Sequence, residues 1–278
     1  MELHDHGLAS DLEMMRQAAE RRQVLRWLLA GAATLPLMSC GGGTDAGGMA
    51  AGGTGTVTLP STGACTVIPE ETGGPYPADG TNTYGGSIIN VLNQSGVVRS
   101  DIRASFNGAT SVAAGVPLTI QLQLLNASGG CASLAGYAVY LWHCDREGLY
   151  SLYSSGVTAQ NYLRGVQETD SAGKLAFTTI FPGCYAGRMP HVHLEVYPSL
   201  AKAASAANRI KTSQFTFPMA TLNEAYAASG YTASVRNLAQ ISYPTDNVFS
   251  DGTSLQMAAV TGNATDGYVV TLTIAVNG

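Results

Sequence analysis

Charged side chains are scarce in this sequence. Asp, Glu, Lys and Arg make up 12% of its 278 residues, and the formal net charge is -5. So few basic residues exclude a nucleic-acid binder that works through a basic surface, and the composition also excludes a disordered polyelectrolyte. No run of 18 uncharged apolar residues occurs, so no segment has the length of a membrane-spanning helix. Histidine is rare as well, with five residues in all.

Glycine, proline and tyrosine are well represented, with 33, 11 and 13 residues. Turn-forming residues between apolar and β-branched runs favour an all-β chain. Period-two alternation or short apolar runs predict strands at 118–124, 137–142, 175–179, 192–197 and 267–276. Two alanine-rich stretches, 199–207 and 221–229, predict short helices. We therefore expect an all-β fold, a β-sandwich with long loops and few short helices.

Residues 1–40 resemble an export signal. Arg21 and Arg22 precede an apolar stretch, residues 27–38, which is too short to span a membrane but suits the apolar part of a signal peptide. A twin arginine in this position is typical of Tat signals, which export folded proteins. The following residues, up to Cys40, resemble a lipobox, in which the Cys40 thiol would be acylated. The alternative is a short N-terminal helix.

Residues 41–64 have the composition of a linker, with nine glycines and one charged residue, Asp45. Such a segment cannot bury a core and behaves as a flexible tether with a reach of roughly 25–30 Å. Lipid and tether together predict a membrane-anchored protein, periplasmic or at the cell surface, whose folded domain is residues 65–278. Gly41 replaces the Asp that retains many lipoproteins at the inner membrane, so we expect the outer membrane.

Four cysteines remain after Cys40: Cys65, Cys131, Cys144 and Cys184. An even number in an oxidising compartment predicts two disulfides. Three pairings are possible, and four buried free thiols are the alternative.

The pair His191 and His193 is the first sign of a metal site. It lies in a predicted strand, where period two places both imidazoles on one face. Two imidazoles can bind Zn, Cu, Ni or Fe, so the pair does not identify the metal. Two surface histidines on a polar strand face are the alternative. The cupin pattern is disfavoured because no later histidine follows.

Six blocks of sequence, in this order, resemble the intradiol ring-cleavage dioxygenases. They are PEETGGPYP (69–77), VRSDIR (98–103), WHCDREGLYS (142–151), LRGVQ (163–167), YAGRMPHVH (185–193) and TSQFTFP (212–218). The resemblance covers residues 65–277. It implies the β-sandwich of that family and a non-haem Fe(III) cofactor.

The family's functional residues carry over position by position. Two tyrosines and two histidines bind the iron in the family, and the matching residues here are Tyr150, Tyr185, His191 and His193. The family's active-site arginine and pocket glutamine match Arg188 and Gln214, and its substrate-contacting stretch matches Gly74, Pro75 and Tyr76. Phenolates are hard anionic donors that suit Fe(III), which agrees with this ligand set.

The resemblance implies that both atoms of O2 are inserted into a catechol-type diol, giving a cis,cis-muconate-type diacid. Tyr185 would act as a base, Arg188 would stabilise the anionic substrate, and Gln214 would donate a hydrogen bond in the pocket. Gly187 replaces an aromatic wall residue of the protocatechuate enzymes, so we expect a more open pocket. The alternative function is a non-catalytic, surface-anchored binding lipoprotein that retains the fold. The oligomeric state stays open.

Bringing Tyr150 and Tyr185 to one iron would also bring Cys144 and Cys184 close together. We therefore expect a Cys144–Cys184 disulfide, which leaves Cys65 and Cys131 as the second pair. A buried Cys144 thiol is the alternative.

Overall fold

A computed structural model describes residues 65–278 of the chain. The signal, Cys40 and the linker predicted within residues 1–64 lie outside the described residues. Among residues 65–278, no helix is long and apolar enough to cross a membrane.

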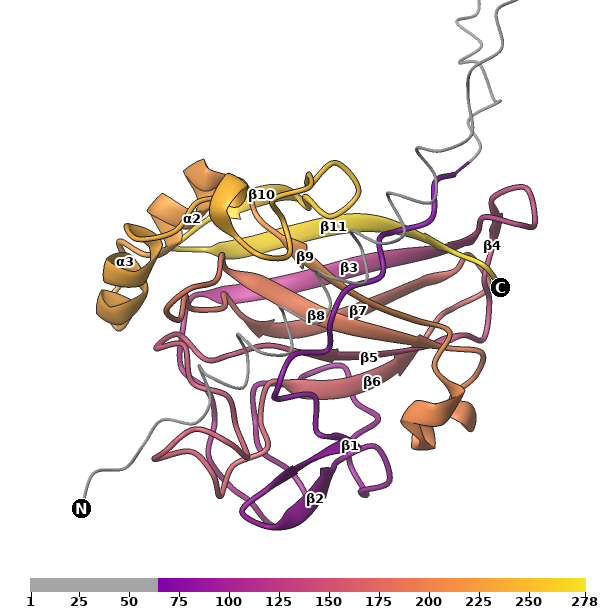
Figure 1. Cartoon of the computed structure of the whole chain (residues 1–278), viewed down its shortest axis with the longest axis horizontal. Helices are drawn as coiled ribbons and strands as arrows, with labels where there is room; N and C mark the ends of the chain where they lie inside the picture. Colours follow the sequence, from indigo (N-terminus) through magenta and orange to yellow (C-terminus); the bar gives the residue numbers. More distant parts are fainter. Residues whose placement is uncertain (1–64) are drawn as a thin grey trace, which may run out of the picture.

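Two β-sheets form the framework (Figure 1). The five-stranded sheet contains β10 (Ala259–Asn263), β11 (Gly267–Val276), β3 (Pro117–Asn126), β4 (Ala132–Ser133) and β7 (Lys174–Ile180). The four-stranded sheet has the order β6 (Arg164–Glu168), β5 (Ala138–Trp142), β8 (His191–Tyr197) and β9 (Lys211–Thr216). A separate hairpin joins β1 (Asp79–Tyr84) and β2 (Ser87–Asn90). The pairing is antiparallel throughout these ladders except between β3 and β11, which run parallel. The predicted all-β class and the five predicted strands are confirmed.

Helical segments are few and short, as predicted. They are the α-helices α2 (Met219–Ala225) and α3 (Thr232–Leu238) and the 3-10 turns η1 (Lys202–Ala204), η2 (Ala206–Asn208) and η3 (Tyr243–Thr245). The alanine-rich stretch 199–207 does not form one helix, because Ser205 has extended backbone angles and separates η1 from η2. Helix α3, with no alanine-rich run to mark it, was not predicted.

The β8 strand separates the core from the site. Val192, Leu194 and Val196 point into the main hydrophobic core between the two sheets. His191 and His193 alternate with them and therefore lie on the opposite face. Loops cover this outer face, where a second cluster contains Trp142 and Tyr150. One strand thus supplies both the core and the site.

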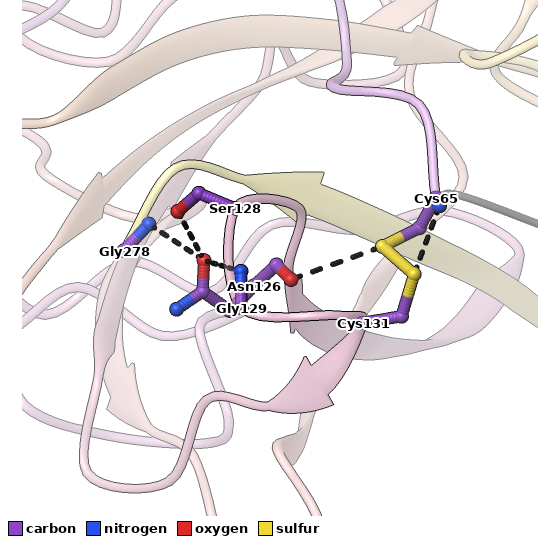
Figure 2. The surroundings of a disulfide bond; sticks show 6 residues. All are labelled: Cys65, Asn126, Ser128, Gly129, Cys131 and Gly278. Carbon is purple, nitrogen blue, oxygen red and sulfur yellow. Dashed lines mark hydrogen bonds between the residues drawn. A yellow bond between two sulfur atoms is a disulfide. The ribbon is translucent and has the colours of Figure 1, made fainter.

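Cys65 and Cys131 form a disulfide, which ties the start of the described domain to the turn after β3 (Figure 2). This pairing was predicted, but the Cys144–Cys184 disulfide was wrong: both thiols are buried and free. Cys144 Sγ is directed at the carbonyl of Gly183 at 3.5 Å, and Cys184 Sγ at the carbonyl of Arg188 at 3.3 Å. The segments do lie close together, but the two side chains are aimed at backbone acceptors.

Candidate metal centre

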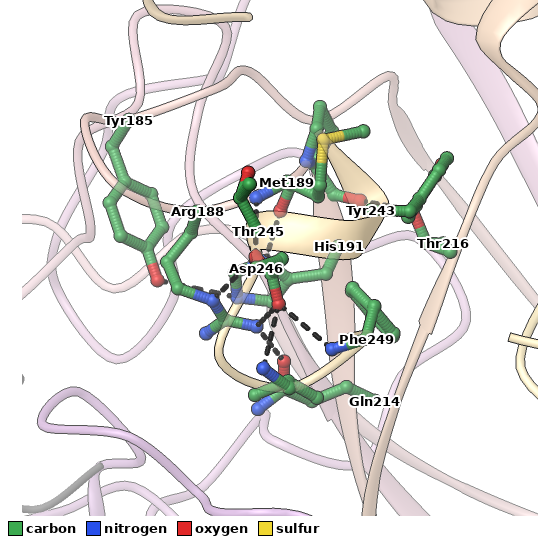
Figure 3. Close-up of polar contacts among 12 residues, drawn as sticks. Tyr185, Arg188, Met189, His191, Gln214, Thr216, Tyr243, Thr245, Asp246 and Phe249 are labelled. Atoms are coloured by element: carbon green, nitrogen blue, oxygen red, sulfur yellow. Dashed lines mark hydrogen bonds and ion pairs between the residues drawn. The ribbon is translucent and has the colours of Figure 1, made fainter. Parts of the chain in front are cut away.

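The four predicted metal ligands come from three segments. Tyr150 lies on the loop after β5, Tyr185 lies on the loop between β7 and β8, and the two histidines are the first and third residues of β8. All except Tyr185 are almost fully buried. Figure 3 shows Tyr185 pointing back toward His191.

These four side chains converge on one point. Nε2 of His191 lies 3.0 Å from Nε2 of His193. The same nitrogen lies 3.4 Å from the hydroxyl of Tyr150 and 3.4 Å from the hydroxyl of Tyr185. Glu195, the next residue on this face of β8, is not part of the group, because its carboxylate accepts a hydrogen bond from Tyr197 at 2.6 Å and lies beside Arg209.

Two glycines allow the tyrosine loops to approach each other. A Cβ at Gly183 would lie 2.6 Å from the carbonyl oxygen of Asp145, so any side chain there would push the loops apart. Gly148 has a φ of +88°, and a Cβ there would lie 3.1 Å from Cβ of Tyr185. The close approach of the two ligand loops therefore depends on the absence of side chains at these positions.

Hydrogen bonding and stacking orient the two imidazoles. Nδ1 of His191 donates to the carbonyl of Met189 at 2.6 Å, which leaves Nε2 with its lone pair facing the other donors. The ring of His193 stacks on Trp142 with a centroid distance of 4.8 Å and an angle of 2°. Burial lowers the pKa of both histidines well below the usual value, and the Arg188 charge lowers it further. Both rings are therefore neutral, which is the form that binds a metal.

Arg188 and Gln214 lie beside this group (Figure 3). Nη2 of Arg188 donates to Oε1 of Gln214 at 2.7 Å, and Nε2 of Gln214 donates to the carbonyl of Thr72 at 2.8 Å. Burial by itself lowers the pKa of Arg188, but Tyr185 and Asp246 raise it more, so the guanidinium stays charged. Gln214 was expected to donate to substrate; here it bridges Arg188 and the Thr72 carbonyl.

The predicted substrate-contacting stretch lies next to the ligands. A Cβ at Gly74 would be 3.5 Å from Cε1 of His193, and the ring of Tyr76 lies 4.8 Å from that of Tyr150. Pro75 precedes Tyr76 and accepts a hydrogen bond from Asn82 through its carbonyl. Gly187 is exposed, in keeping with a pocket that lacks a wall at this position.

His143 is not part of the convergent group. Its Nδ1 lies 2.7 Å from the carbonyl of Cys144, and its Nε2 lies 2.7 Å from the hydroxyl of Thr179. Both ring nitrogens are therefore occupied, and the residue joins the end of β5 to β7.

Sequence reasoning missed two buried charged residues at the site. Asp246 pairs with Arg188 at 3.0 Å. Arg164 is fully buried and donates to the backbone carbonyls of Ser151 and Tyr76, so it connects the Tyr150 loop to the substrate-contacting stretch. Arg164 belongs to the LRGVQ block at 163–167, but nothing in the sequence near Asp246 indicates its contact with Arg188.

The distances around His191 Nε2 are those expected for donors that share a single metal ion. Donor atoms bound at about 2.1 Å lie about 3.0 Å apart when their bonds are at right angles and about 3.4 Å apart at the tetrahedral angle. The distances from His191 Nε2 to the other three donor atoms, 3.0, 3.4 and 3.4 Å, match these values. Two phenol oxygens and two imidazoles form a hard, partly anionic set, which suits Fe(III). No group of three His, Cys, Asp or Glu side chains could hold a metal in the described domain, so the tyrosines are essential to this reading.

Dioxygenases are among the known proteins that this chain resembles. A family profile described as "Dioxygenase" matches residues 94–209, which include Tyr150, Tyr185 and both histidines. No curated protein matches the chain. An intradiol ring-cleavage dioxygenase from Tetranychus urticae superposes with a TM-score of 0.59 and 23% identity, over 77% of this chain and 95% of that one.

A second dioxygenase crystal structure gives a TM-score of 0.56 and 24% identity, again over 77% and 95% of the two chains. At these identities the likeness shows the fold alone. The chain therefore contains a segment similar to dioxygenases and has the fold of the intradiol ring-cleavage dioxygenases.

Proposed function

We propose that this protein is an intradiol ring-cleaving dioxygenase for catechol-type diols. It would insert both atoms of O2 into the ring and produce a cis,cis-muconate-type diacid. The observation that carries this proposal is the convergence of Tyr150, Tyr185, His191 and His193 on one point. A binding module without chemistry has no use for four metal donors beside a buried arginine.

The metal in this proposal is non-haem Fe(III), held by those four residues. Two tyrosinates offset two of its three positive charges, and two neutral imidazoles complete the protein's share of the ligands. When bound, the iron would supply a Lewis acid that ligates the substrate oxygens and accepts electron density from the ring.

The protein's own residues handle protons and charge. As a phenolate, the Tyr185 oxygen is a base that accepts a proton from a substrate hydroxyl. The guanidinium of Arg188 faces the same region and stabilises negative charge on the bound diol. Gln214 keeps the guanidinium in place through its Oε1. Burial of Tyr150 and Trp142 keeps water away from the rest of the group.

Iron content, colour and turnover of the purified domain test this proposal. We expect about one iron per chain, a red tyrosinate-to-iron charge-transfer band, and one O2 consumed per catechol cleaved. An iron-free, colourless protein that cannot be reconstituted would favour the non-catalytic binding lipoprotein instead.

Three variants test the residue assignments. His193→Ala should lose iron, and Tyr185→Phe should alter the charge-transfer band and slow turnover. Arg188→Ala should keep iron and colour but lose turnover, because it acts on substrate charge. Wild-type iron and turnover in either ligand variant would contradict the ligand assignment, and loss of iron from Arg188→Ala would make Arg188 a structural residue.

We also propose that the protein is exported and held at a membrane surface by lipid on Cys40. The support is the sequence of residues 1–64. Replacing Arg21 and Arg22 with lysine should block export, and Cys40→Ser should release the protein from the membrane fraction. Unchanged membrane attachment of Cys40→Ser would refute the lipid anchor.

A further inference from the structure

Asp246 is a fully buried carboxylate that ends the 3-10 turn η3, next to the candidate metal centre. Its Oδ1 accepts hydrogen bonds from the backbone N–H groups of Val248 at 2.8 Å and Phe249 at 3.0 Å. Its Oδ2 accepts from Nε of Arg188 at 3.0 Å and from the backbone N–H of Met189 at 2.7 Å. One oxygen thus shapes its own loop, and the other binds the segment that precedes His191 (Figure 3).

The contacts with Asp246 and Gln214 fix the plane of the Arg188 guanidinium. Nε points at Asp246, and Nη2 points at Gln214 Oε1 at 2.7 Å with a longer contact to Asp246 at 3.5 Å. Within residues 65–278, the hydrogen bonds of this guanidinium run through Nε and Nη2. Its third nitrogen, Nη1, is therefore the one available to a bound anion. The planar fork of arginine makes such an orientation specific.

The segment that carries Asp246 is itself anchored beside the histidines. The hydroxyl of Tyr243, at the start of η3, lies 3.0 Å from Oγ1 of Thr216, which in turn donates to the carbonyl of Pro190 at 2.6 Å. Residues 188–190 therefore contact Asp246 directly and Tyr243 through Thr216. This segment lies outside the part of the chain that matches the dioxygenase profile.

We propose that Asp246 is a positioning residue that aims Arg188 at the substrate. The proposal rests on the proposed function, because it assigns the target of Arg188 as the anionic diol. A buried ion pair is a poor source of stability, since its desolvation cost offsets the attraction. The pair instead gives Arg188 one orientation, in which Asp246 and Gln214 occupy Nε and Nη2 and leave Nη1 for the substrate.

Asp246→Asn is the sharpest test. The side-chain oxygen of asparagine can still accept from Val248 and Phe249, which preserves the turn. Its NH2 group would then face two donors, Nε of Arg188 and N–H of Met189, and both hydrogen bonds would be lost. Asp101→Asn is the matched control, because Asp101 forms an exposed ion pair with Arg103 at 2.6 Å.

We expect Asp246→Asn to keep its fold and iron but to lower kcat/KM for a catechol by about 10- to 100-fold, the loss expected for a hydrogen bond between charged groups. In an Arg188→Ala background the same substitution should have little further effect on the residual kcat/KM, because its action passes through Arg188. An equal loss in both backgrounds would show a merely structural role and would overturn the proposal. Asp101→Asn should match the wild type.

An NMR measurement on the metal-free protein keeps this test independent of turnover. The Nε–H signal of Arg188, assigned with Arg188→Ala, should be protected from solvent exchange in the wild type and should lose that protection in Asp246→Asn. An unchanged signal would overturn the proposal. If the wild type cleaves no catechol, the proposed function fails, while the NMR result still decides whether Asp246 holds the guanidinium.

Discussion

Replacing Arg164 with methionine should destabilise the domain and loosen the Tyr150 loop. Arg164 is fully buried, and no carboxylate pairs with it in the described part of the chain. Nε and Nη2 donate to the hydroxyl and carbonyl of Ser151, both at 3.1 Å. Nη1 donates to the carbonyls of Tyr76 at 2.9 Å and Pro77 at 3.2 Å, and to the hydroxyl of Tyr140 at 3.2 Å.

The size of the effect follows from two opposing contributions. Methionine leaves these acceptors without their donor, at about 1–3 kcal/mol for each one that water cannot reach. It also removes a buried cation, so the folded protein no longer bears a desolvation cost of several kcal/mol. We expect a net loss of about 3–5 kcal/mol, because the cost of several unmet acceptors exceeds the desolvation free energy that is recovered, and no carboxylate is left unpaired. For a domain of this size that corresponds to a fall in Tm of roughly 6–20 °C.

Urea unfolding of the metal-free protein, with iron binding as a second readout, checks this prediction. Arg164→Lys should recover part of the stability, because lysine keeps the charge but not the planar fork. Arg103→Met, at an exposed ion pair, is the control and should change stability by less than about 1 kcal/mol. If Arg164→Met is as stable as the control and binds iron as tightly as the wild type, the reasoning about Arg164 is wrong.

Three further predictions follow from the same contacts. Replacing Cys65 and Cys131 with serine should lower the free energy of unfolding by about 4 kcal/mol on the chain-entropy model, because the bridge spans 66 residues. Iron binding should stay intact. Equal urea midpoints for the variant and the wild type would contradict this prediction. Burial lowers the pKa of His143 to about 4. The unfolded chain therefore binds one more proton than the folded protein between about pH 4 and 6.5, and the free energy of unfolding falls by up to about 3 kcal/mol as the pH drops through this window. In urea titrations at several pH values, His143→Gln should flatten this part of the stability profile. Burial raises the pKa of Cys184 to about 12 and raises that of Cys144 well above its usual value, so thiol reagents should label neither before unfolding; labelling of the native protein would contradict this.

The strands could be predicted from the sequence because their signal is local. The alternation of Leu118, Ile120, Leu122 and Leu124 marks β3, and all four side chains are buried. The same period places His191 and His193 on one face of β8, so the spacing of these two residues was enough to predict this half of the candidate site. The tyrosines required the resemblance to a family, because a single tyrosine on a loop has no local pattern.

Contacts between distant segments could not be predicted in the same way. Asp246 contacts Arg188 across 58 residues, and no local pattern in the sequence indicates this contact. The prediction of a Cys144–Cys184 disulfide failed for a related reason. The convergence of the tyrosines predicts that two segments lie close together, but it does not predict where each thiol points. The Cys144 and Cys184 thiols are directed at the carbonyls of Gly183 and Arg188.

The scarcity of charge in this chain makes its buried arginines informative. Only 14 lysines and arginines occur in the sequence, yet Arg164 and Arg188 are both almost fully buried close to the four donors. Burying a cation costs free energy, and neither contact is an efficient way to stabilise a β-sandwich. The proposed site, with two phenolates and a deprotonated diol, would need nearby positive charge. Arg164, without a carboxylate partner in residues 65–278, raises the local potential, whereas Arg188 is held by Asp246 and gains a fixed direction. The two arginines therefore have different roles beside one anionic site. The variants of Arg164 and Asp246 should distinguish the effect of local potential from the effect of orientation.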